Sequence, residues 1–211
     1  METLTVALTK GRLAEKTLKL LTDAGYDCSQ ILDGSRRLIF EDEDNRLRFF
    51  LAKGPDVPTY VEYGAADIGV TGSDIILEEN RRVYEVLDLG FGKCSMCVCG
   101  PESAAHLLEH HEKIRVATKY PRIARDYFYH QKNQTVDIIK LSGSVELGPI
   151  VALSDVIVDI VETGATLKEN GLDVLETIIP LSARMVVNPV SMQMKSARIR
   201  ELIDRIRSVL Q

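Results

Sequence analysis

Two stretches of the chain repeat the same order of residues. In the first, Lys53-Gly-Pro precedes an expected helix and then Asp67-Ile-Gly-Val70. In the second, Leu141-Ser-Gly-Ser precedes an expected helix and then Asp155-Val-Ile-Val158, and the interval from Leu141 to Asp155 equals that from Lys53 to Asp67. The repeat predicts two similar α/β lobes, each with a set of loops at the ends of its strands. A chance resemblance between two strand–helix units is the alternative.

Apolar runs rich in β-branched residues alternate with helical stretches along the chain, which predicts an α/β fold. We expect strands at Thr3–Leu8, Ser35–Phe40, Leu47–Ala52, Asp67–Thr71, Val83–Leu89, Cys94–Cys99, Ile114–Thr118, Thr135–Leu141, Val156–Val158, Asp173–Ile179 and Ala183–Val187. We expect helices at Leu13–Ala24, Val57–Tyr63, Ile75–Glu79, Glu102–His111, Ile123–His130, Val145–Ala152 and Ser191–Leu210. Because the chain is expected to cross between lobes near Gly90–Lys93 and Ile179–Ser182, lobe I covers residues 1–91 plus 181–211 and lobe II covers residues 92–180. The loop sets of the two lobes are expected to face a shared cleft.

The stretch from Asp159 to Leu167, DIVETGATL, combines features of an anion site. It follows Val156-Ile-Val158, which is typical of a buried parallel strand, and that strand is expected to end in Asp159 and Glu162. The small turn Thr163-Gly-Ala-Thr166 offers hydroxyl and backbone N–H donors, and a helix is expected from Leu167. Carboxylates beside an anion site need sugar hydroxyls or a metal ion as partners. A phosphorylated ribose therefore suits the stretch, although an ordinary strand–turn–helix corner explains it equally well.

Lobe I carries cations that could face such a site. The loop Thr9-Lys-Gly-Arg12 follows the first expected strand and precedes a helix, an order that favours phosphate binding. Arg36 and Lys53 lie near the ends of other expected strands. Two anionic ligands could therefore meet between the lobes, although a solvated turn with surface charges has equal weight for the loop alone.

Composition limits the classes of function. The net charge of −5 argues against a broad nucleic-acid interface. The sequence has no apolar run long enough to span a bilayer and no basic signal-peptide start, so we expect a cytoplasmic protein. Cys94, Cys97 and Cys99 lie in one apolar run, which favours a buried strand over a metal site. The four histidines show no ligand pattern, and no metal ligands are expected from the protein.

Several motifs together resemble the catalytic subunit of the ATP phosphoribosyltransferase family, the first enzyme of histidine biosynthesis. They are Ala7-Leu-Thr-Lys-Gly-Arg12, Ser35-Arg-Arg-Leu-Ile-Phe40, Asp56-Val-Pro-Thr-Tyr-Val-Glu62, Gly64-Ala-Ala-Asp-Ile-Gly-Val70, Thr118-Lys-Tyr-Pro121, Leu141-Ser-Gly-Ser-Val-Glu146, and the signature from Glu146 through Asp159–Leu167. Because these motifs occur in order and almost end to end, their combination is far more specific than any of them alone.

The resemblance implies a bilobal fold like that of the type II periplasmic binding proteins, with ATP and pyrophosphate on lobe I and phosphoribosyl pyrophosphate (PRPP) on lobe II. Residues implied to hold the PRPP 5′-phosphate are Thr163, Gly164, Ala165 and Thr166, followed by Leu167, and Asp159, Glu162 or Glu146 is implied to face the ribose hydroxyls. Residues implied to contact the ATP phosphates and pyrophosphate are Lys10, Gly11, Arg12, Arg36, Lys53, Ser73 and Asp74. Arg12 and Arg36 are expected to be catalytic, because a guanidinium can bind two phosphate oxygens at once. Lys53 departs from the arginine that family members often carry, and lysine has no planar fork.

The resemblance also implies the reaction: N1 of the ATP adenine attacks C1 of the PRPP ribose and pyrophosphate leaves, with Mg²⁺ carried by the substrate. The nucleophile belongs to the substrate, which agrees with the lack of a convincing catalytic triad. The chain ends at Gln211, without room for the histidine-binding domain of longer members. A hetero-oligomer with a regulatory subunit resembling histidyl-tRNA synthetase is therefore expected. Alternatives are a bilobal small-anion binding protein without catalysis and a phosphoribosyltransferase that uses a smaller base.

Overall fold

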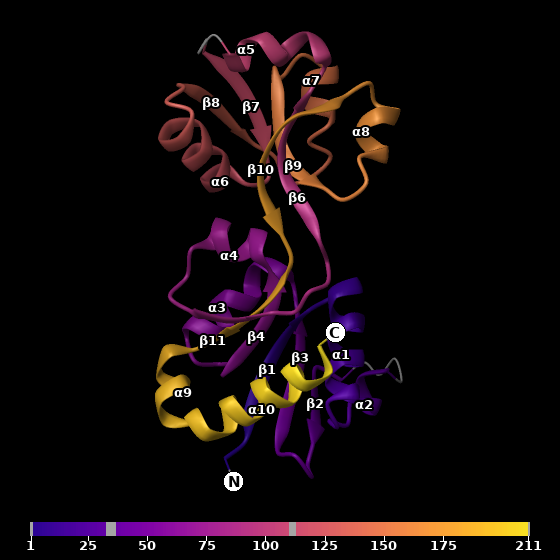
Figure 1. Ribbon diagram of the computed structural model, residues 1–211, viewed down its shortest axis with the longest axis vertical. Helices are drawn as coiled ribbons and strands as arrows, with labels where there is room; N and C mark the ends of the chain where they lie inside the picture. Colours follow the sequence, from indigo (N-terminus) through magenta and orange to yellow (C-terminus); the bar gives the residue numbers. More distant parts are fainter. Residues whose placement is uncertain (1, 33–36, 110–112, 211) are drawn as a thin grey trace. The chain divides into compact units, whose positions relative to one another are not determined.

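The computed structural model describes residues 2–32, 37–109 and 113–210 of the chain. The chain divides into two compact units (Figure 1). Unit 1 contains Met1–Gly92 and Ser182–Gln211, and unit 2 contains Lys93–Leu181. Each unit has its own sheet and its own apolar core. None of the described helices is long and apolar enough to cross a membrane.

Unit 1 is built on a six-stranded sheet in the order β2-β3-β1-β4-β11-β5. Its strands are β1 (Leu4–Thr9), β2 (Ile39–Asp42), β3 (Leu47–Ala52), β4 (Ile68–Gly72), β5 (Tyr84–Asp88) and β11 (Ala183–Val187). Its helices are α1 (Arg12–Asp23), α2 (Ser29–Leu32), the short η1 (Gly54–Asp56), α3 (Val57–Glu62), α4 (Ser73–Glu79), α9 (Pro189–Met194) and α10 (Ser196–Val209). β1 pairs in parallel with β3 and β4, whereas β2, β5 and β11 run antiparallel to their neighbours.

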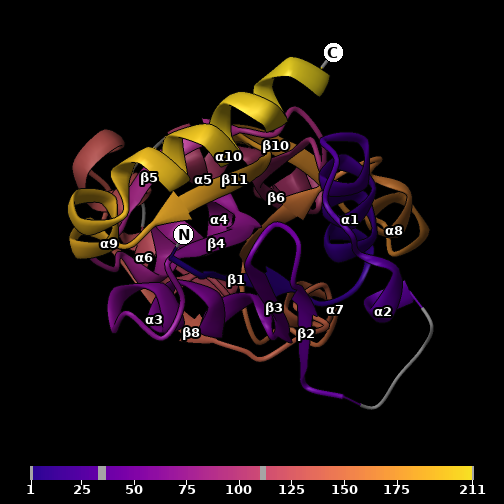
Figure 2. The same cartoon turned by 90° about the horizontal axis from the view of Figure 1, so that it is seen from below.

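Alternate residues of the central strands of unit 1 face two different apolar layers. Val6 of β1 packs in the cluster that contains α1 and α10, whereas Ala7 packs in the cluster that contains α3. Figure 2 shows α10 along one side of these strands and α3 on the other. A β-carbon added to Gly69 of β4 would lie 2.7 Å from Val61 Cγ2 and 2.8 Å from Val57 Cγ1. Glycine at this position therefore lets α3 pack directly on the sheet.

Unit 2 is built on a five-stranded sheet in the order β10-β6-β9-β7-β8. Its strands are β6 (Cys94–Gly100), β7 (Ile114–Thr118), β8 (Val136–Lys140), β9 (Val156–Val161) and β10 (Asp173–Leu181). Its helices are η2 (Glu102–Ala104), α5 (Ala105–Glu109), α6 (Pro121–Arg125), the π-helical η3 (Asp126–Gln131), α7 (Leu147–Ile150) and α8 (Ala165–Glu169). β7 pairs in parallel with β8 and β9, whereas β6 is antiparallel to β9 and β10. The predicted α/β class is confirmed in both units.

The centre of the sheet is repeated in the two units. β1 lies between β3 and β4, β7 lies between β8 and β9, and all these pairs are parallel. An aspartate just before β4 and one just before β9 make the same hydrogen bonds to the neighbouring strands β1 and β7. Asp67 Oδ2 accepts a hydrogen bond from Thr5 N at 2.8 Å, and Asp155 Oδ2 accepts one from Arg115 N at 2.7 Å. The backbone N–H of each aspartate donates to the carbonyl of the same partner, at 2.8 and 2.9 Å. The repeat that the sequence predicts is therefore present in the strand order and in these aspartate hydrogen bonds.

The C-terminal segment forms two helices, and the prediction of a single helix over Ser191–Leu210 was wrong. α9 starts after Asn188, whose side chain accepts a hydrogen bond from Ser191 N at 2.9 Å. Lys195 then separates α9 from α10, and its amine donates to Asp67 Oδ2 at 3.0 Å. The contact joins the residue between the two helices to a buried carboxylate that is remote in sequence. The amphipathic pattern of the C-terminal segment therefore gives no sign of the break.

Other predicted helices are shortened or divided in the structure. The expected helix over Val145–Ala152 is reduced to the four residues of α7, and Ala152 has a left-handed φ of 56°, which is incompatible with an α-helix. The expected helix over Ile123–His130 is α6 followed by the π-helical η3. The expected helix over Glu102–His111 divides into η2 and α5, and its last two residues lie outside the described residues.

We expect Asp155→Asn to lower the thermal stability of the protein by a few degrees near neutral pH. Hydrogen bonds from Arg115 hold the pKa of Asp155 below its ordinary value, so ionised Asp155 stabilises the folded state above the pKa that it has when unfolded. That contribution is lost as the pH falls through the lower, folded-state pKa. Thermal unfolding followed by circular dichroism over a pH series should show the difference from wild type shrinking towards acidic pH. A difference that is constant across the series would contradict the charge-based role.

Candidate functional site

Three parallel strands of unit 2, β8, β7 and β9, end at the same edge of the sheet. The connection after β7 leads to α6, whose Ile123 packs in the same cluster as Val116. The connection after β9 leads to α8, whose Leu167 packs in the same cluster as Ala117. Because Val116 and Ala117 point to opposite faces of the sheet, the two connections leave on opposite faces. In α/β sheets such a divergence between adjacent strands opens a crevice at their carboxyl ends, where ligands bind.

The segment after β9 forms a tight turn that can receive an anion. Gly164 has a left-handed conformation (φ 73°, ψ 3°) directly before α8, which a residue with a β-carbon adopts at a cost. Thr163 Oγ1 accepts a hydrogen bond from Ala165 N at 3.4 Å inside the turn. The side chains of Thr163 and Thr166 are exposed. The first N–H groups of a helix have no partner within it, so this turn combines backbone and hydroxyl donors.

Two of the three predicted sugar-binding carboxylates, Asp159 and Glu146, affect the pKa of Cys99. Burial raises the pKa of Cys99 to about 12, and the negative charges of Asp159 and Glu146 add to this shift. Asp159 is two residues after Ile157 in β9, so it points to the face of the sheet that carries α8. Asp159 lies inside β9, opposite Cys97, because the strand continues to Val161 and does not end at the aspartate as predicted. The third carboxylate, Glu162, is exposed at the start of the turn.

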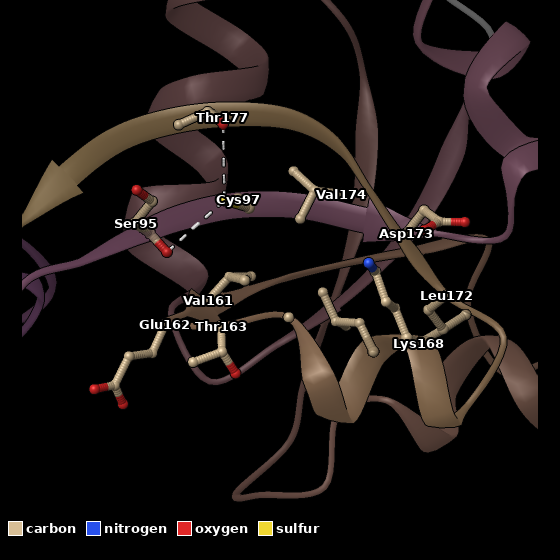
Figure 3. Close-up of a pocket in the computed structure, with 12 residues that line it drawn as sticks. Ser95, Cys97, Val161, Glu162, Thr163, Lys168, Leu172, Asp173, Val174 and Thr177 are labelled. Atoms are coloured by element: carbon tan, nitrogen blue, oxygen red, sulfur yellow. Dashed lines mark hydrogen bonds between the residues drawn. The ribbon is translucent and has the colours of Figure 1, made fainter.

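A cavity of about 430 Å³ lies beside this turn within unit 2 (Figure 3). Its walls come from β6, β9, α8 and β10, and its polar groups belong to Ser95, Glu162, Thr163, Lys168, Asp173 and Thr177. In Figure 3 the side chain of Lys168 extends from α8 towards β10. The cavity therefore places a cation and several hydroxyls next to the predicted anion turn.

Four polar residues of this cavity are absent from the sequence-based prediction: Ser95, Lys168, Asp173 and Thr177. Lys168 could have been found, because it follows Thr166 closely on the same helix. Ser95 and Thr177 could not have been found, because they lie on β6 and β10, far from the turn in sequence. Only the sheet order β10-β6-β9 brings these two hydroxyls to the end of β9.

Cys97 and Cys99 of β6 are buried thiols, and Cys94 is half-buried. Cys97 Sγ lies 3.8 Å from the Ser95 carbonyl oxygen and 4.0 Å from Thr177 Oγ1. Burial raises the pKa of Cys97, so the thiol stays protonated near neutral pH and is a poor nucleophile. Cys94, Cys97 and Cys99 form no disulfide with the described residues, and their predicted strand is confirmed. Over residues 2–32, 37–109 and 113–210, no group of three or more His, Cys, Asp or Glu could hold a metal.

The described cations predicted for ATP and pyrophosphate lie at one edge of the unit 1 sheet. Lys10 and Arg12 follow β1, and Lys53 follows the adjacent parallel strand β3. Lys10 N donates to the Ala52 carbonyl at 2.9 Å, which ties the two strand ends together. Gly11 has φ 89°, a left-handed value that favours glycine. The side chains of Lys10, Arg12 and Lys53 are exposed, so three cations and a glycine lie together at this edge.

The remaining predicted residues have different surroundings. Ser73 is buried, donates its N–H to the Ser182 carbonyl at 2.9 Å, and accepts from Ser182 N through Oγ at 3.1 Å, which joins β4 to β11. Asp74 is the second residue of α4 at the same edge. Leu167 is buried in the apolar cluster under α8 and therefore belongs to the core. Arg36 lies outside the described residues.

Comparison with known proteins gives the family. The model of the ATP phosphoribosyltransferase family matches residues 53–208. The ATP phosphoribosyltransferase of Lachnoclostridium phytofermentans is 65% identical over 211 residues, which cover 100% of this chain and 98% of that protein. The same enzyme of Lachnospira eligens is 61% identical over 212 residues, with coverage of 100% and 98%. A solved chain of the ATP phosphoribosyl transferase (HisG:HisZ) complex from Thermotoga maritima has a TM-score of 0.83 and 34% identity, and the match covers 99% of this chain and 98% of that one. On this basis the chain belongs to the ATP phosphoribosyltransferase family.

Proposed function

We propose that this chain performs the reaction of its family with PRPP bound by unit 2 and ATP bound by unit 1. In the reaction, N1 of adenine forms a bond to C1 of the ribose, while the bond from C1 to pyrophosphate breaks and its electron pair leaves with pyrophosphate. The alkylated adenine releases a proton from N6, and the product is phosphoribosyl-ATP, the first intermediate of histidine biosynthesis. The observation that carries the PRPP assignment is the turn at Gly164, beside a cavity that is lined by Lys168 and several polar groups.

The turn after β9 suits the 5′-phosphate of PRPP. Thr163, Gly164, Ala165 and Thr166 offer backbone N–H groups and two hydroxyls, all at one place. Lys168 adds a positive charge to the wall of the neighbouring cavity. Donors that are fixed before the ligand arrives bind an anion without a large cost of ordering, which favours this end of PRPP for the turn.

The carboxylates suit the ribose. A carboxylate next to a phosphate repels it but accepts hydrogen bonds from sugar hydroxyls, so Asp159, Glu146 or Glu162 is the partner of the 2- and 3-hydroxyls. Mg²⁺ keeps several waters and binds one or two carboxylates together with substrate phosphates. Mg²⁺ would be carried by the substrate, with Asp159 or Glu146 as its protein ligand, and would supply positive charge to pyrophosphate.

The cations of unit 1 suit the polyphosphate groups. Lys10, Arg12 and Lys53 lie at one sheet edge, with Gly11 allowing close approach of the backbone, and Ser73 and Asp74 follow β4 there. Arg12 and Arg36 are proposed as catalytic, because negative charge develops on pyrophosphate as it leaves and a guanidinium binds two phosphate oxygens. Lys53 provides a point charge, so its contribution is less directional than that of an arginine.

No protein nucleophile is needed, because the attacking atom belongs to ATP. This agrees with the protonated state of Cys97 in the cavity wall. The direct test is incubation with ATP, PRPP and Mg²⁺, followed by mass spectrometry for phosphoribosyl-ATP. No product, with or without a regulatory partner, would favour a small-anion binding protein. A product formed only with a smaller base would indicate a different phosphoribosyltransferase.

We further propose that the chain is the catalytic subunit of a cytoplasmic hetero-oligomer. The support is that the similar chain from Thermotoga maritima is described as part of a HisG:HisZ complex. The partner proposed here is a regulatory subunit that resembles histidyl-tRNA synthetase. Co-expression of the two genes from one organism, followed by affinity purification through one subunit, tests this assembly. Recovery of the tagged subunit alone would argue against it.

We expect Thr166→Ala to raise the KM for PRPP by about tenfold, because it removes one hydroxyl donor to a charged phosphate. The KM for ATP should change much less. Steady-state kinetics with each substrate varied in turn measures both constants. Thr135→Ala is the control, because Thr135 is exposed and precedes β8 at the opposite edge of the same sheet. Equal effects on the two constants would show that the turn is not specific for PRPP.

We expect Arg12→Ala, and separately Arg36→Ala, to lower kcat on the order of a hundredfold, if each side chain supplies about 3 kcal/mol to the transition state. The physical reason is the loss of positive charge at the departing pyrophosphate. Single-turnover kinetics should show the loss in the chemical step. Arg200→Ala, an exposed change on α10, should retain wild-type turnover. Wild-type turnover of the double variant would reject both assignments.

A further inference from the structure

We propose that Lys119 binds the pyrophosphate of PRPP from unit 2 itself, an inference that rests on the assignment of PRPP to this unit. Lys119 directly follows β7, the strand that lies between β8 and β9. Its side chain is exposed and makes no hydrogen bond or ion pair with the part of the chain that the structure describes. A cation in this position is therefore available to a ligand at the carboxyl ends of the strands.

The register of β7 and β9 places Lys119 beside the carboxylates. Thr118 is the partner of Val158 across the parallel pair, so Lys119 and Asp159 are the next residues along their strands. Adjacent strands are about 4.8 Å apart, which puts the two positions on the two sides of the crevice. Lys119 thus follows β7, and the turn of residues 163–166 follows the adjacent strand β9.

The internal repeat gives an independent reason to consider this lysine. Thr9 at the end of β1 donates its hydroxyl to the Val70 carbonyl at 2.9 Å, and Thr118 at the end of β7 donates its hydroxyl to the Val158 carbonyl at 2.6 Å. In both units the residue that follows this threonine is a lysine, Lys10 or Lys119. The two units therefore present a lysine at the same point of the same strand arrangement. The proposal gives Lys119 the anion-binding role that is proposed for Lys10.

The sheet order indicates which part of PRPP meets Lys119. The cavity beside the turn is bounded by β6 and β10, on one side of β9, whereas β7 lies on the other side. Asp159 lies on β9 between them. PRPP has a phosphate on C5, hydroxyls on C2 and C3, and pyrophosphate on C1. With the 5′-phosphate at the turn and the hydroxyls at the carboxylates, the C1 substituent extends towards β7 and reaches Lys119.

The test compares two ligands that differ only in the pyrophosphate. PRPP and ribose 5-phosphate are titrated separately, by calorimetry, into the full-length chain and its Lys119→Met variant. Lys119→Met should weaken PRPP binding by about tenfold or more and leave ribose 5-phosphate binding within about twofold of wild type. Lys119→Arg should restore most of the PRPP affinity. Thr166→Ala should weaken both ligands, because both carry the 5′-phosphate.

The matched control is Lys113→Met, the same change at an exposed lysine just before β7, at the opposite end of that strand. It should bind both ligands as wild type does. Unchanged PRPP affinity in Lys119→Met would overturn the proposal, and so would an equal loss for both ligands, because the lysine would then act on the sugar phosphate. If wild type binds neither ligand, the assignment of PRPP to unit 2 is rejected, and the role of Lys119 with it. If Thr166→Ala weakens both ligands while Lys119→Met has no effect, only the role of Lys119 fails.

Discussion

The parallel pairing of β7 with β8 and β9 is the constraint on which the site in unit 2 depends. Parallel strands need crossover connections, so their carboxyl ends meet at one edge and only residues just beyond those ends can gather there. The bond from Arg115 N to Asp155 helps fix the register of β7 against β9. A slip by one residue would move Asp159 to the other face of the sheet, away from Glu146. The corresponding bond of Asp67 to Thr5 N acts on the strands of unit 1 in the same way.

The strands could be predicted from the sequence because their information is local. The runs at Ile114–Thr118 and Ala183–Val187 have the bounds that their apolar residues predict. The C-terminal helix could not be predicted as well, because its break at Lys195 depends on a contact with Asp67 that is remote in sequence. A buried carboxylate needs a partner, and that requirement overrides a helical pattern. The same limit applies to α7, which the sequence predicts as a longer helix.

The candidate site also contains residues that the sequence can predict and residues that it cannot. The turn at Gly164 could be predicted, because a left-handed residue between a strand and a helix is encoded by the local sequence. Ser95 and Thr177 could not, because antiparallel strands from distant parts of the chain bring them to the cavity. Ser73 shows a further limit: a serine after a strand has the same pattern whether it binds a ligand or, as here, a backbone group of Ser182. Local sequence therefore identifies donors, and the fold decides whether they are already used.

The lysines show how the fold separates structural from ligand-binding charge. Lys132 pairs with Glu176 and Lys195 with Asp67, and both pairs connect a helical segment to a strand end or strand. Lys10, Lys53 and Lys119 are exposed at strand ends and pair with no carboxylate among the described residues. A lysine that is already paired loses its ion pair when it binds a ligand, whereas an exposed lysine loses only its hydrogen bonds to water. Strand-end lysines therefore keep their electrostatic attraction for a polyanion, although the chain carries a net charge of −5.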